Sequence, residues 1–375
     1  MRHTIRCCLL RLCLLSVLLI LVFIGSIEAA TLNVPGEYST WGEAIVASQF
    51  GDEIVTAPEH ICQPGVMLQP KAGTTFKQGT VDCSLLPTAI YVGGYYGEKS
   101  DIRFEGVTFI NGRVAVEVST TTVVKNITFL NCIFTQQSKH AIKVWGGEDI
   151  TIAGCVFEEI GRYDPLYPLT RFNPPILMNG TIGALVIDNV TMRTGAIRLN
   201  KCIAVIKGNE CIDNPFLAIS VVDPINVQIR GNVIHSMMPE PPCCAQGDKT
   251  GIGVPSNIGG GYVLIEDNII GPRDPGIWIT GPSNSSLPRM GPIVIRGNIF
   301  EECENAAMVI NRGIDVVTIE NNFVSDFTGT KGVIQLIDVT LAVIKNNVYE
   351  SLEVPFIKVW GEEVTVEEEN NIELR

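Results

Sequence analysis

The sequence is short of basic residues: 27 Lys and Arg stand against 40 Asp and Glu, which gives a net charge of −13 at pH 7. The overall field of such a chain does not attract nucleic acid or an anionic membrane surface. We therefore expect no nucleic-acid partner. A strongly polyanionic substrate would need a local basic site or a bound cation.

The sequence also contains no CxxC pair, so the cysteine spacing of a zinc site is missing. Nine of the 12 cysteines follow residue 30, at positions 62, 83, 132, 155, 202, 211, 243, 244 and 303. In a secreted chain we expect disulfide bonds among them, and the odd number leaves at least one thiol unpaired or bound to another molecule. Cys243 and Cys244 are expected to bridge to other loops, because a bond between adjacent cysteines is strained.

An apolar run extends from Cys13 to Ile24, after three arginines and before the small residues of SIEAA at 26–30. This arrangement is typical of a secretory signal peptide over residues 1–30. We expect a secreted protein, with a retained signal anchor as the alternative, and no other contact with a membrane. Four sequons agree with secretion and predict glycosylation at Asn126, Asn179, Asn189 and Asn284.

One pattern recurs along the chain after residue 100: apolar residues alternate, then Asn or Gly and a small residue or Asn follow, then another apolar residue. ITFLNCIF (127–134), VQIRGNVI (227–234) and IVIRGNIF (293–300) are examples. The sixth position of each unit is taken as a marker, and successive markers lie about 24 residues apart outside three longer intervals. The markers are Val107, Cys132, Cys155, Val190, Asn209, Asn232, Asn268, Asn298, Asn322 and Asn347.

A period near 24 with alternation inside each unit predicts an all-β fold, a single-stranded parallel β-helix of about eleven coils over residues 31–375. Each coil holds three short strands, and stacking buries the apolar face that one coil cannot bury alone. The repeated Asn is expected to adopt the left-handed turn conformation and to bond the Asn of the next coil. Cys132 and Cys155 are expected to stack on adjacent coils, either as thiols or as a disulfide.

Residues 31–56 are expected to cover the N-terminal end of the stack. Thr40 and Glu43 form a capping box, and Trp41, Ala44 and Ile45 make one apolar face of a short helix. No comparable cap is visible in the acidic segment VTVEEENNIELR at the other end.

VPGEYSTWGEAI, then GDEIVTAP, then tandem Asn-turn repeats resemble the right-handed β-helix proteins of the pectin lyase-like superfamily. The resemblance covers essentially the whole chain after residue 30 and implies the right-handed fold. It does not select an activity, because the superfamily includes lyases, polygalacturonases, epimerases and tailspikes. The polygalacturonase motifs NTD, GHG and RIK are absent, as is the epimerase motif DPH.

The segments AIKVWG (141–146) and FIKVWG (356–361) are near copies, which predicts equivalent places on one sheet. Alternation makes two outward columns there, the first with Lys143, Trp278 and Lys358 and the second with Trp145 and Trp360. Asn179 and Asn200 join the second column. In the superfamily that the chain resembles, this face commonly lines a polysaccharide groove. An indole offers a flat apolar surface for sugars. The alternative is that the aromatic side chains only stabilise the sheet.

Long intervals between markers predict loop insertions at 158–175, 235–251 and 281–291. The first two lie beside the outward columns and bracket Arg198. Polysaccharide elimination requires a base and a group that neutralises the substrate carboxylate. The candidate base or neutraliser is Arg198, assisted by Lys201, Arg171 and Lys143, with Tyr163 as the proton donor.

Three aspartates, Asp164, Asp223 and Asp248, are candidate Ca²⁺ ligands, although no cofactor is required. Asp164 and Asp223 are also candidate catalytic carboxylates of a hydrolase, which needs two such groups about 5–9 Å apart. The sequence thus predicts a protein that binds, and in one hypothesis cleaves, an extracellular polysaccharide. The alternative is a non-catalytic glycan-binding or structural surface protein.

Overall fold

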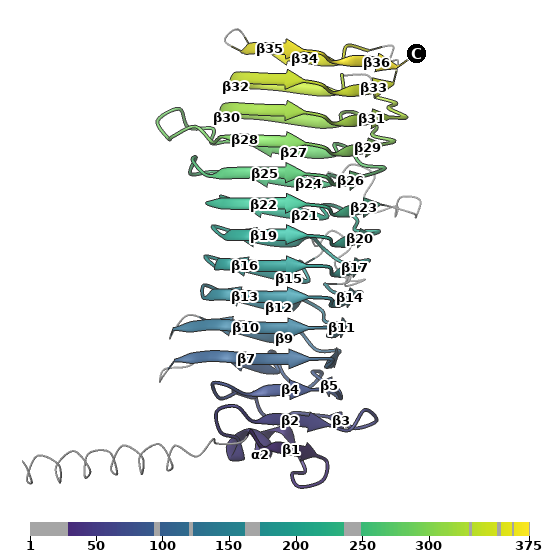
Figure 1. The fold of residues 1–375 in the computed structure, drawn as a ribbon. Coiled ribbons are helices and arrows are strands. Elements are labelled where there is room, and N and C mark those ends of the chain that lie inside the picture. The colour runs from purple at the N-terminus through teal and green to yellow at the C-terminus, as the bar shows by residue number, and fades with distance from the viewer. Residues whose placement is uncertain are drawn as a thin grey trace, which may run out of the picture.

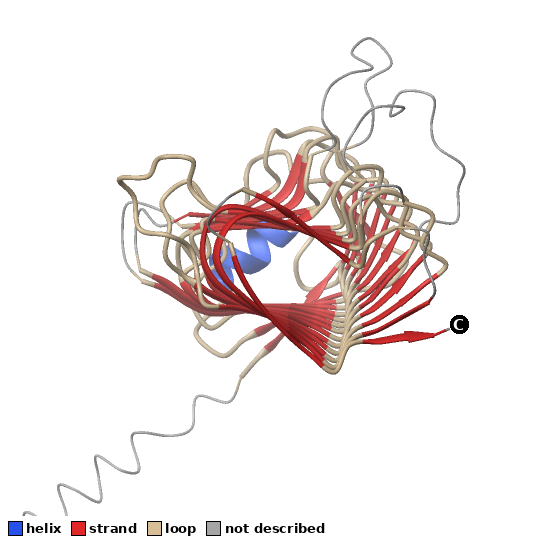
Figure 2. Ribbon diagram, turned by 90° about the horizontal axis from the view of Figure 1, so that it is seen from above, coloured by secondary structure: helices blue, strands red, loops and turns tan. Residues whose placement is uncertain are grey.

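The computed structural model describes residues 29–93, 98–119, 123–161, 173–235, 249–329, 332–350, 354–361 and 364–374. The chain winds into a parallel β-helix, in which consecutive coils stack along one axis from the N-terminal end to the C-terminal end (Figure 1). Viewed along the axis, the coils superimpose and the single helix of the described residues lies across the end of the column (Figure 2). No helix among the described residues is long and apolar enough to cross a membrane.

Three lines of strands form the walls, and we name them faces A, B and C. Face A consists of β6 (Ile90–Val92), β9 (Val114–Ser119), β12 (His140–Trp145), β15 (Ile176–Asn179), β18 (Ile197–Asn200), β21 (Ile219–Val222), β24 (Ile252–Pro255), β27 (Ile277–Thr280), the first parts of β30 (Met308–Glu320) and β32 (Ile334–Lys345), and β34 (Ile357–Trp360).

Face B follows face A along the chain. It consists of β1 (Thr31–Val34), β2 (Glu53–Thr56), β4 (Thr75–Lys77), β7 (Lys99–Glu105), β10 (Val124–Leu130), β13 (Glu148–Ala153), β16 (Ile182–Ile187), β19 (Ile203–Lys207), β22 (Asn226–Arg230), β25 (Tyr262–Glu266), β28 (Ile293–Arg296), the second parts of β30 and β32, and β35 (Thr365–Glu369). Because β30 and β32 run through both faces, A and B form one 23-stranded sheet.

Face C is a separate 13-stranded sheet. It consists of β3 (Ile61–Cys62), β5 (Thr80–Asp82), β8 (Thr108–Ile110), β11 (Ile133–Thr135), β14 (Val156–Glu158), β17 (Val190–Met192), β20 (Glu210–Ile212), β23 (Val233–His235), β26 (Ile269–Ile270), β29 (Ile299–Glu301), β31 (Phe323–Ser325), β33 (Val348–Glu350) and β36 (Ile372–Leu374). Its 13 strands exceed the prediction of about eleven coils, because the first coils lack the Asn pattern that was counted.

Alternation places every second side chain of the strands inside the column, where it is buried except in the last coils. Aromatic rings stack from coil to coil: Phe76, Phe104 and Phe129 lie 4.9 and 5.1 Å apart between ring centroids. Such offset stacks add to the apolar area that each coil buries against the next. The core is therefore one continuous column of aliphatic and aromatic side chains.

The helix α2 (Trp41–Ala47) covers the N-terminal end of this column, as predicted. Thr40 Oγ1 accepts a hydrogen bond from the Glu43 N–H at 3.2 Å. The reciprocal bond differs from the prediction, because the Glu43 carboxylate accepts from the backbone and hydroxyl of Ser39. Hydrogen bonds from Ser39 lower the pKa of Glu43, so the helix begins with a charged cap.

The turn from face B to face C carries the predicted ladder. The backbone N–H and the Nδ2 of each ladder Asn donate to the Oδ1 of the next one; for Asn298 and Asn322 the distances are 3.0 and 2.9 Å. The left-handed residue is the one that precedes the ladder Asn, such as Gly297 with φ 64° or Asn321 with φ 56°. The prediction that the ladder Asn itself is left-handed is therefore wrong.

The marker at Val190 is also wrong by one residue. Asn189 occupies the slot, because its Oδ1 accepts from the Cys155 N–H at 2.9 Å and its amide donates to Asn209. Asn189 is fully buried. The prediction of glycosylation at this residue is therefore wrong, since its Nδ2 is already bonded to the Ile152 carbonyl.

The cysteines inside the column are thiols. Cys62, Cys83, Cys132, Cys155, Cys202, Cys211 and Cys303 are all free and buried. The predicted disulfide bonding is wrong for these seven residues, while Cys243 and Cys244 lie outside the described residues. Burial raises the pKa of Cys211 to about 11, so this thiol stays protonated and unreactive at neutral pH.

Candidate functional site

The two outward columns of face A exist as predicted. Strand pairing places Lys143 between Glu117 and Leu177, and Trp145 between Ser119 and Asn179. The first column reads Glu117, Lys143, Leu177, Arg198, Ser220, Gly253, Trp278, Val309, Gln335 and Lys358. The second column contains Trp145, Asn179, Asn200, Val222, Pro255, Thr280, Asn311, Ile337 and Trp360. KVWG therefore repeats because both copies occupy the same position on different coils.

The three tryptophans share this face but do not touch. Trp145 and Trp360 stand in the same column eight coils apart, which corresponds to about 38 Å at about 4.8 Å per coil. Trp278 lies in the other column, about 24 Å along the axis from Trp145. The face therefore presents separate aromatic positions rather than a contiguous strip of indoles.

Trp145 is the indole with the most polar surroundings. Its side chain is 40% exposed, and Lys143 Nζ lies 5.3 Å from the ring centroid. The same Nζ donates to Glu117 Oε1 at 2.9 Å, while the other oxygen of Glu117 accepts from Thr88 Oγ1 at 3.3 Å. The lysine is thereby held over the ring, which fixes the orientation of the indole.

Two carboxamides continue the column next to Trp145. Asn179 and Asn200 lie on the next two coils, in register with the indole and with each other. Both residues are partly exposed, although Asn200 Oδ1 itself is buried and has no hydrogen-bond partner. We call the group Glu117, Lys143, Trp145, Asn179, Arg198 and Asn200 the Trp145 patch.

The other two tryptophans have simpler surroundings. Trp360 is 46% exposed, and Lys358 Nζ lies 4.5 Å from its ring centroid, which repeats the arrangement at Trp145. Trp278 is only partly exposed and stands beside Gly253. A Cβ on Gly253 would lie 2.6 Å from the Leu217 side chain, so a neighbouring loop reaches over the sheet here and limits access to Trp278.

The candidate catalytic residues are only partly brought together. Arg198 lies within β18 and Lys201 directly follows this strand, and both are exposed. Asp223 is buried, and its Oδ1 accepts from the Asn257 N–H at 2.6 Å. This carboxylate holds the turn that follows β24, so we assign it a structural role instead of the predicted catalytic or calcium-binding one.

Several predictions fall outside the described residues. Tyr163, Asp164, Arg171 and Asp248 belong to this group, as do the central parts of the insertions at 158–175 and 235–251. In the described part of the chain, no group of three or more His, Cys, Asp or Glu side chains is arranged to hold a metal ion. Calcium binding by Asp164 and Asp248 remains a prediction.

The remaining sequons have different surroundings. Asn126 and Asn284 are exposed, which is compatible with a glycan. Asn179 is partly exposed and stands beside Trp145. A glycan on Asn179 would cover the Trp145 patch, so its two predicted roles exclude each other.

The sequence prediction did not include Glu117 and Thr88 among the binding residues. Glu117 carries a detectable signal, because it directly precedes Lys143 in the same column and has the opposite charge. Thr88 belongs to the loop before β6 and has no such periodic position, so only the folded chain shows its contact with Glu117.

Comparisons with known proteins agree with this architecture. The family model described as right handed beta helix region matches residues 176–348. No curated protein sequence matches the chain. The matched residues are similar to that family, and the fold of the described chain is the parallel β-helix that the resemblance implied.

Solved structures give the same fold at low identity. One is PfbA, a surface adhesin of Streptococcus pneumoniae, with a TM-score of 0.54 and 12% identity over 88% of this chain and 87% of that chain. Another is the tailspike protein of E. coli bacteriophage HK620 in complex with pentasaccharide, with a TM-score of 0.53 and 9% identity. It is matched over 88% of this chain and 60% of its own, so the chain spans about three fifths of that tailspike structure.

Proposed function

We propose that the protein is a secreted polysaccharide-binding protein that holds a sugar chain on the Trp145 patch of face A. The observation that carries the proposal is the Lys143–Trp145 arrangement. An exposed indole makes a cation–π contact with a lysine whose ammonium group is held by Glu117. A rigid exposed aromatic ring loses little conformational freedom when a ligand binds.

The chemistry of the patch suits a sugar better than an apolar ligand. The indole provides a flat surface for the C–H groups of one sugar ring. Asn179 and Asn200 offer amide donors and acceptors to hydroxyl groups at steps of about 4.8 Å along the axis. Lys143 is paired with Glu117, so the exposed Arg198 supplies the net positive charge of the patch, which favours a sugar chain that carries a carboxylate near this position.

Two proteins of the same fold support the direction of the proposal. One is a tailspike whose structure was solved in complex with a pentasaccharide, and the other is a surface adhesin. Their identity to this chain is too low to transfer a site. The support is that a protein with this fold has been solved in complex with an oligosaccharide.

The test is retention on an array of immobilised polysaccharides, compared between the unmodified protein and Trp145→Ala. We expect the substitution to reduce affinity at least tenfold for the polysaccharide that is bound best, because it removes the stacking surface. Trp360→Ala is the matched control, since it removes an equally exposed indole next to a lysine eight coils away. Unchanged retention of Trp145→Ala would rule the patch out.

Cleavage is a second candidate function, favoured by the exposure of Arg198 and Lys201 beside the patch. The same array, analysed for reducing ends and unsaturated products, separates the two functions. A lyase predicts product that is lost in Lys201→Ala, a change outside the Trp145 patch, while retention persists. A binding protein releases no product from any polysaccharide that it retains.

A further inference from the structure

The coil formed by β34, β35 and β36 has only one neighbouring coil among the described residues. β34 and β35 pair with β32 alone, and β36 pairs with β33 alone (Figure 1). Val359 is 41% exposed, whereas Leu336 and Ile310, which fill the same inward position on the two preceding coils, are fully buried. Among the described residues, the backbone of this coil is therefore paired on one side only, and its inward side chains are partly exposed.

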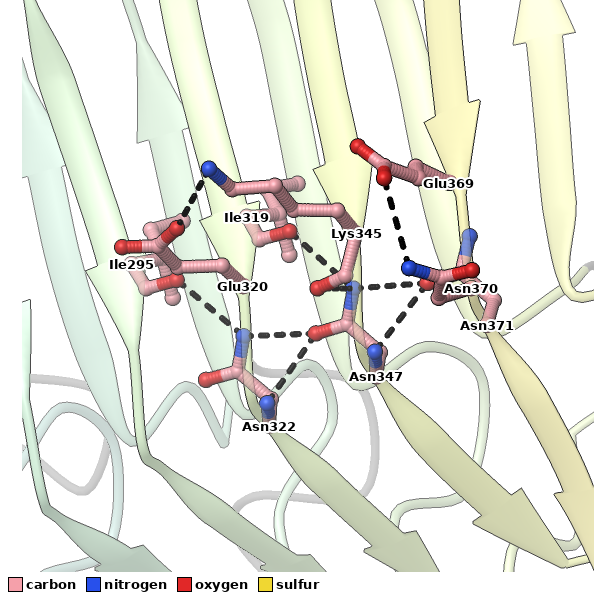
Figure 3. A network of polar contacts seen from close by, with 9 residues as sticks. All are labelled: Ile295, Ile319, Glu320, Asn322, Lys345, Asn347, Glu369, Asn370 and Asn371. Atoms are coloured by element: carbon pink, nitrogen blue, oxygen red, sulfur yellow. Dashed lines mark hydrogen bonds and ion pairs between the residues drawn. The ribbon is translucent and has the colours of Figure 1, made fainter.

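The Asn ladder is also open at this end. Asn322 donates from its backbone N–H and its Nδ2 to Asn347 Oδ1, and Asn347 donates in the same way to Asn371 Oδ1 (Figure 3). Asn371 Nδ2 reaches back to the Ile344 carbonyl at 3.1 Å. No further Asn of the described chain lies above Asn371, so its backbone N–H faces the open edge.

Acidic and basic side chains alternate from coil to coil along the outer edge of face B, and the last side chain of this row is acidic. Glu266 pairs with Arg296 at 2.6 Å, and Glu320 pairs with Lys345 at 3.1 Å on the next two coils. Glu369 then stands above Lys345 in register (Figure 3). A basic side chain on one further strand would complete a third pair of the same kind.

Two inward positions of this coil are acidic as well. Glu368 lies in register with the buried Ile344, and Glu373 with Tyr349. Burial and then the charges of Glu373 and Glu368 raise the pKa of Tyr349, which shows that both carboxylates act on the top of the column. An aliphatic strand that covered Glu368 would bury its carboxylate without supplying an opposite charge.

We propose that the edge of β34, β35 and β36 is an acceptor site for an extended, basic segment of a second polypeptide. The segment adds as a further parallel strand, with Lys or Arg opposite Glu368 and Glu369 and with an Asn above Asn371. Main-chain hydrogen bonds provide the affinity of such strand addition, and the side chains provide the register.

A second copy of this chain is disfavoured as the occupant. Two copies that met through this edge about a two-fold axis would pair β35 with itself in antiparallel orientation. Glu367, Glu368 and Glu369 would then face the same three residues of the other copy, and like charges directly opposite each other destabilise a strand pair.

The test uses the full chain and the peptide LAVKKNNVK, which repeats residues 341–349 with lysine in place of Ile344 and Tyr349. We expect it to bind at least tenfold more tightly than the acidic peptide LAVEENNVE in a fluorescence anisotropy titration. The peptide LAVKKNLVK, which lacks the ladder Asn, is expected to bind several-fold more weakly than LAVKKNNVK. Amide hydrogen exchange is expected to slow in β34, β35 and β36 when LAVKKNNVK is bound.

Protein variants localise the effect. Glu368→Gln combined with Glu369→Gln is expected to lower the affinity for LAVKKNNVK at least tenfold, whereas Glu59→Gln, an exposed carboxylate at the other end of the molecule, leaves it unchanged. The proposal is overturned by equal binding of the basic and acidic peptides, by undiminished binding to the double variant, or by no detectable binding. It is also overturned if sedimentation shows that the protein dimerises through this edge.

Discussion

His140 shows how a residue at the start of one face A strand holds the loop that leads into the next face A strand. The side chain is buried, and Nδ1 lies 2.8 Å from the Pro174 carbonyl, so Nδ1 carries the proton and donates it. Burial lowers the pKa of His140 to about 4, from the usual 6.5. The neutral imidazole therefore ties the base of the insertion at 158–175 to β12, which carries Trp145.

The pH dependence of stability follows from this pKa. Between pH 6.5 and pH 4 the unfolded chain binds a proton at His140 and the folded chain does not, so acid favours unfolding in this window. The loss from this group amounts to about 3 kcal/mol once the pH is below 4. Urea unfolding at about pH 7 and about pH 4.5 should show that His140→Gln loses less stability on acidification than the unmodified protein. An identical loss in both proteins would contradict the assignment.

At the scale of the element, the ladder turn between faces B and C is the most repeated structure in the molecule. Asn298 donates to the Ile265 carbonyl and to Asn322 Oδ1, and its own Oδ1 accepts from Asn268. All of these groups lie in the buried turn. Removing one amide leaves donors and acceptors on three coils unsatisfied.

We expect Asn298→Ala to lower the free energy of unfolding by about 2–4 kcal/mol, since each unsatisfied buried group costs about 1–3 kcal/mol. Asn298→Asp should be worse at neutral pH, because a carboxylate cannot donate a hydrogen bond and its second oxygen would face the oxygens of Ile265 and Asn322. Asn257→Ala is the control: its side chain is exposed, and the bond to Asp223 comes from its backbone. Equal stability of Asn298→Ala and Asn257→Ala in thermal unfolding would refute the structural role of the ladder.

The sequence predicted the strands and both columns of face A, because period-two alternation decides which side chains face outward. It misplaced the ladder at Val190, because the apolar pattern alone does not fix the turn. The turn is fixed by a left-handed Asp, Asn or Gly followed by the ladder residue, as in Asp188 with φ 53° before Asn189. A search for this pair of residues would have found Asn189.

The sequence predicted the candidate site less completely. Its outward positions follow from counting along each strand, and the Trp145 patch was found in this way. The contacts that decide exposure come from loops that reach the neighbouring coil. Two examples are the Leu217 side chain next to Gly253 and the hydrogen bond from the Asn257 N–H to Asp223. Both depend on the path of such loops, and no periodic pattern encodes that path.

At the scale of the whole molecule, the β-helix is a one-dimensional stack, and different kinds of side chain lie over the core at its two ends. At the C-terminal coil, carboxylates stand over the core. At the N-terminal end, Trp41 closes the column: it is 1% exposed, lies 4.8 Å from the Phe76 ring, and donates from Nε1 to Thr56 Oγ1 at 2.7 Å. The aromatic stack of the first coils thus begins on a residue of the helix.

Because each coil contacts mainly its neighbours, damage to this cap should stay local. Trp41→Ala removes a fully buried large side chain, a change that costs about 3–5 kcal/mol in a core. We expect amide hydrogen exchange to accelerate in β1, β2 and β4, while β22 and β25, which lie several coils away, keep their protection. Trp41→Phe, which retains the ring over Phe76 and loses the bond to Thr56, should show a smaller effect on the same strands. Uniform acceleration along the whole stack would instead mean that the coils unfold as one cooperative unit and that the cap stabilises all of them.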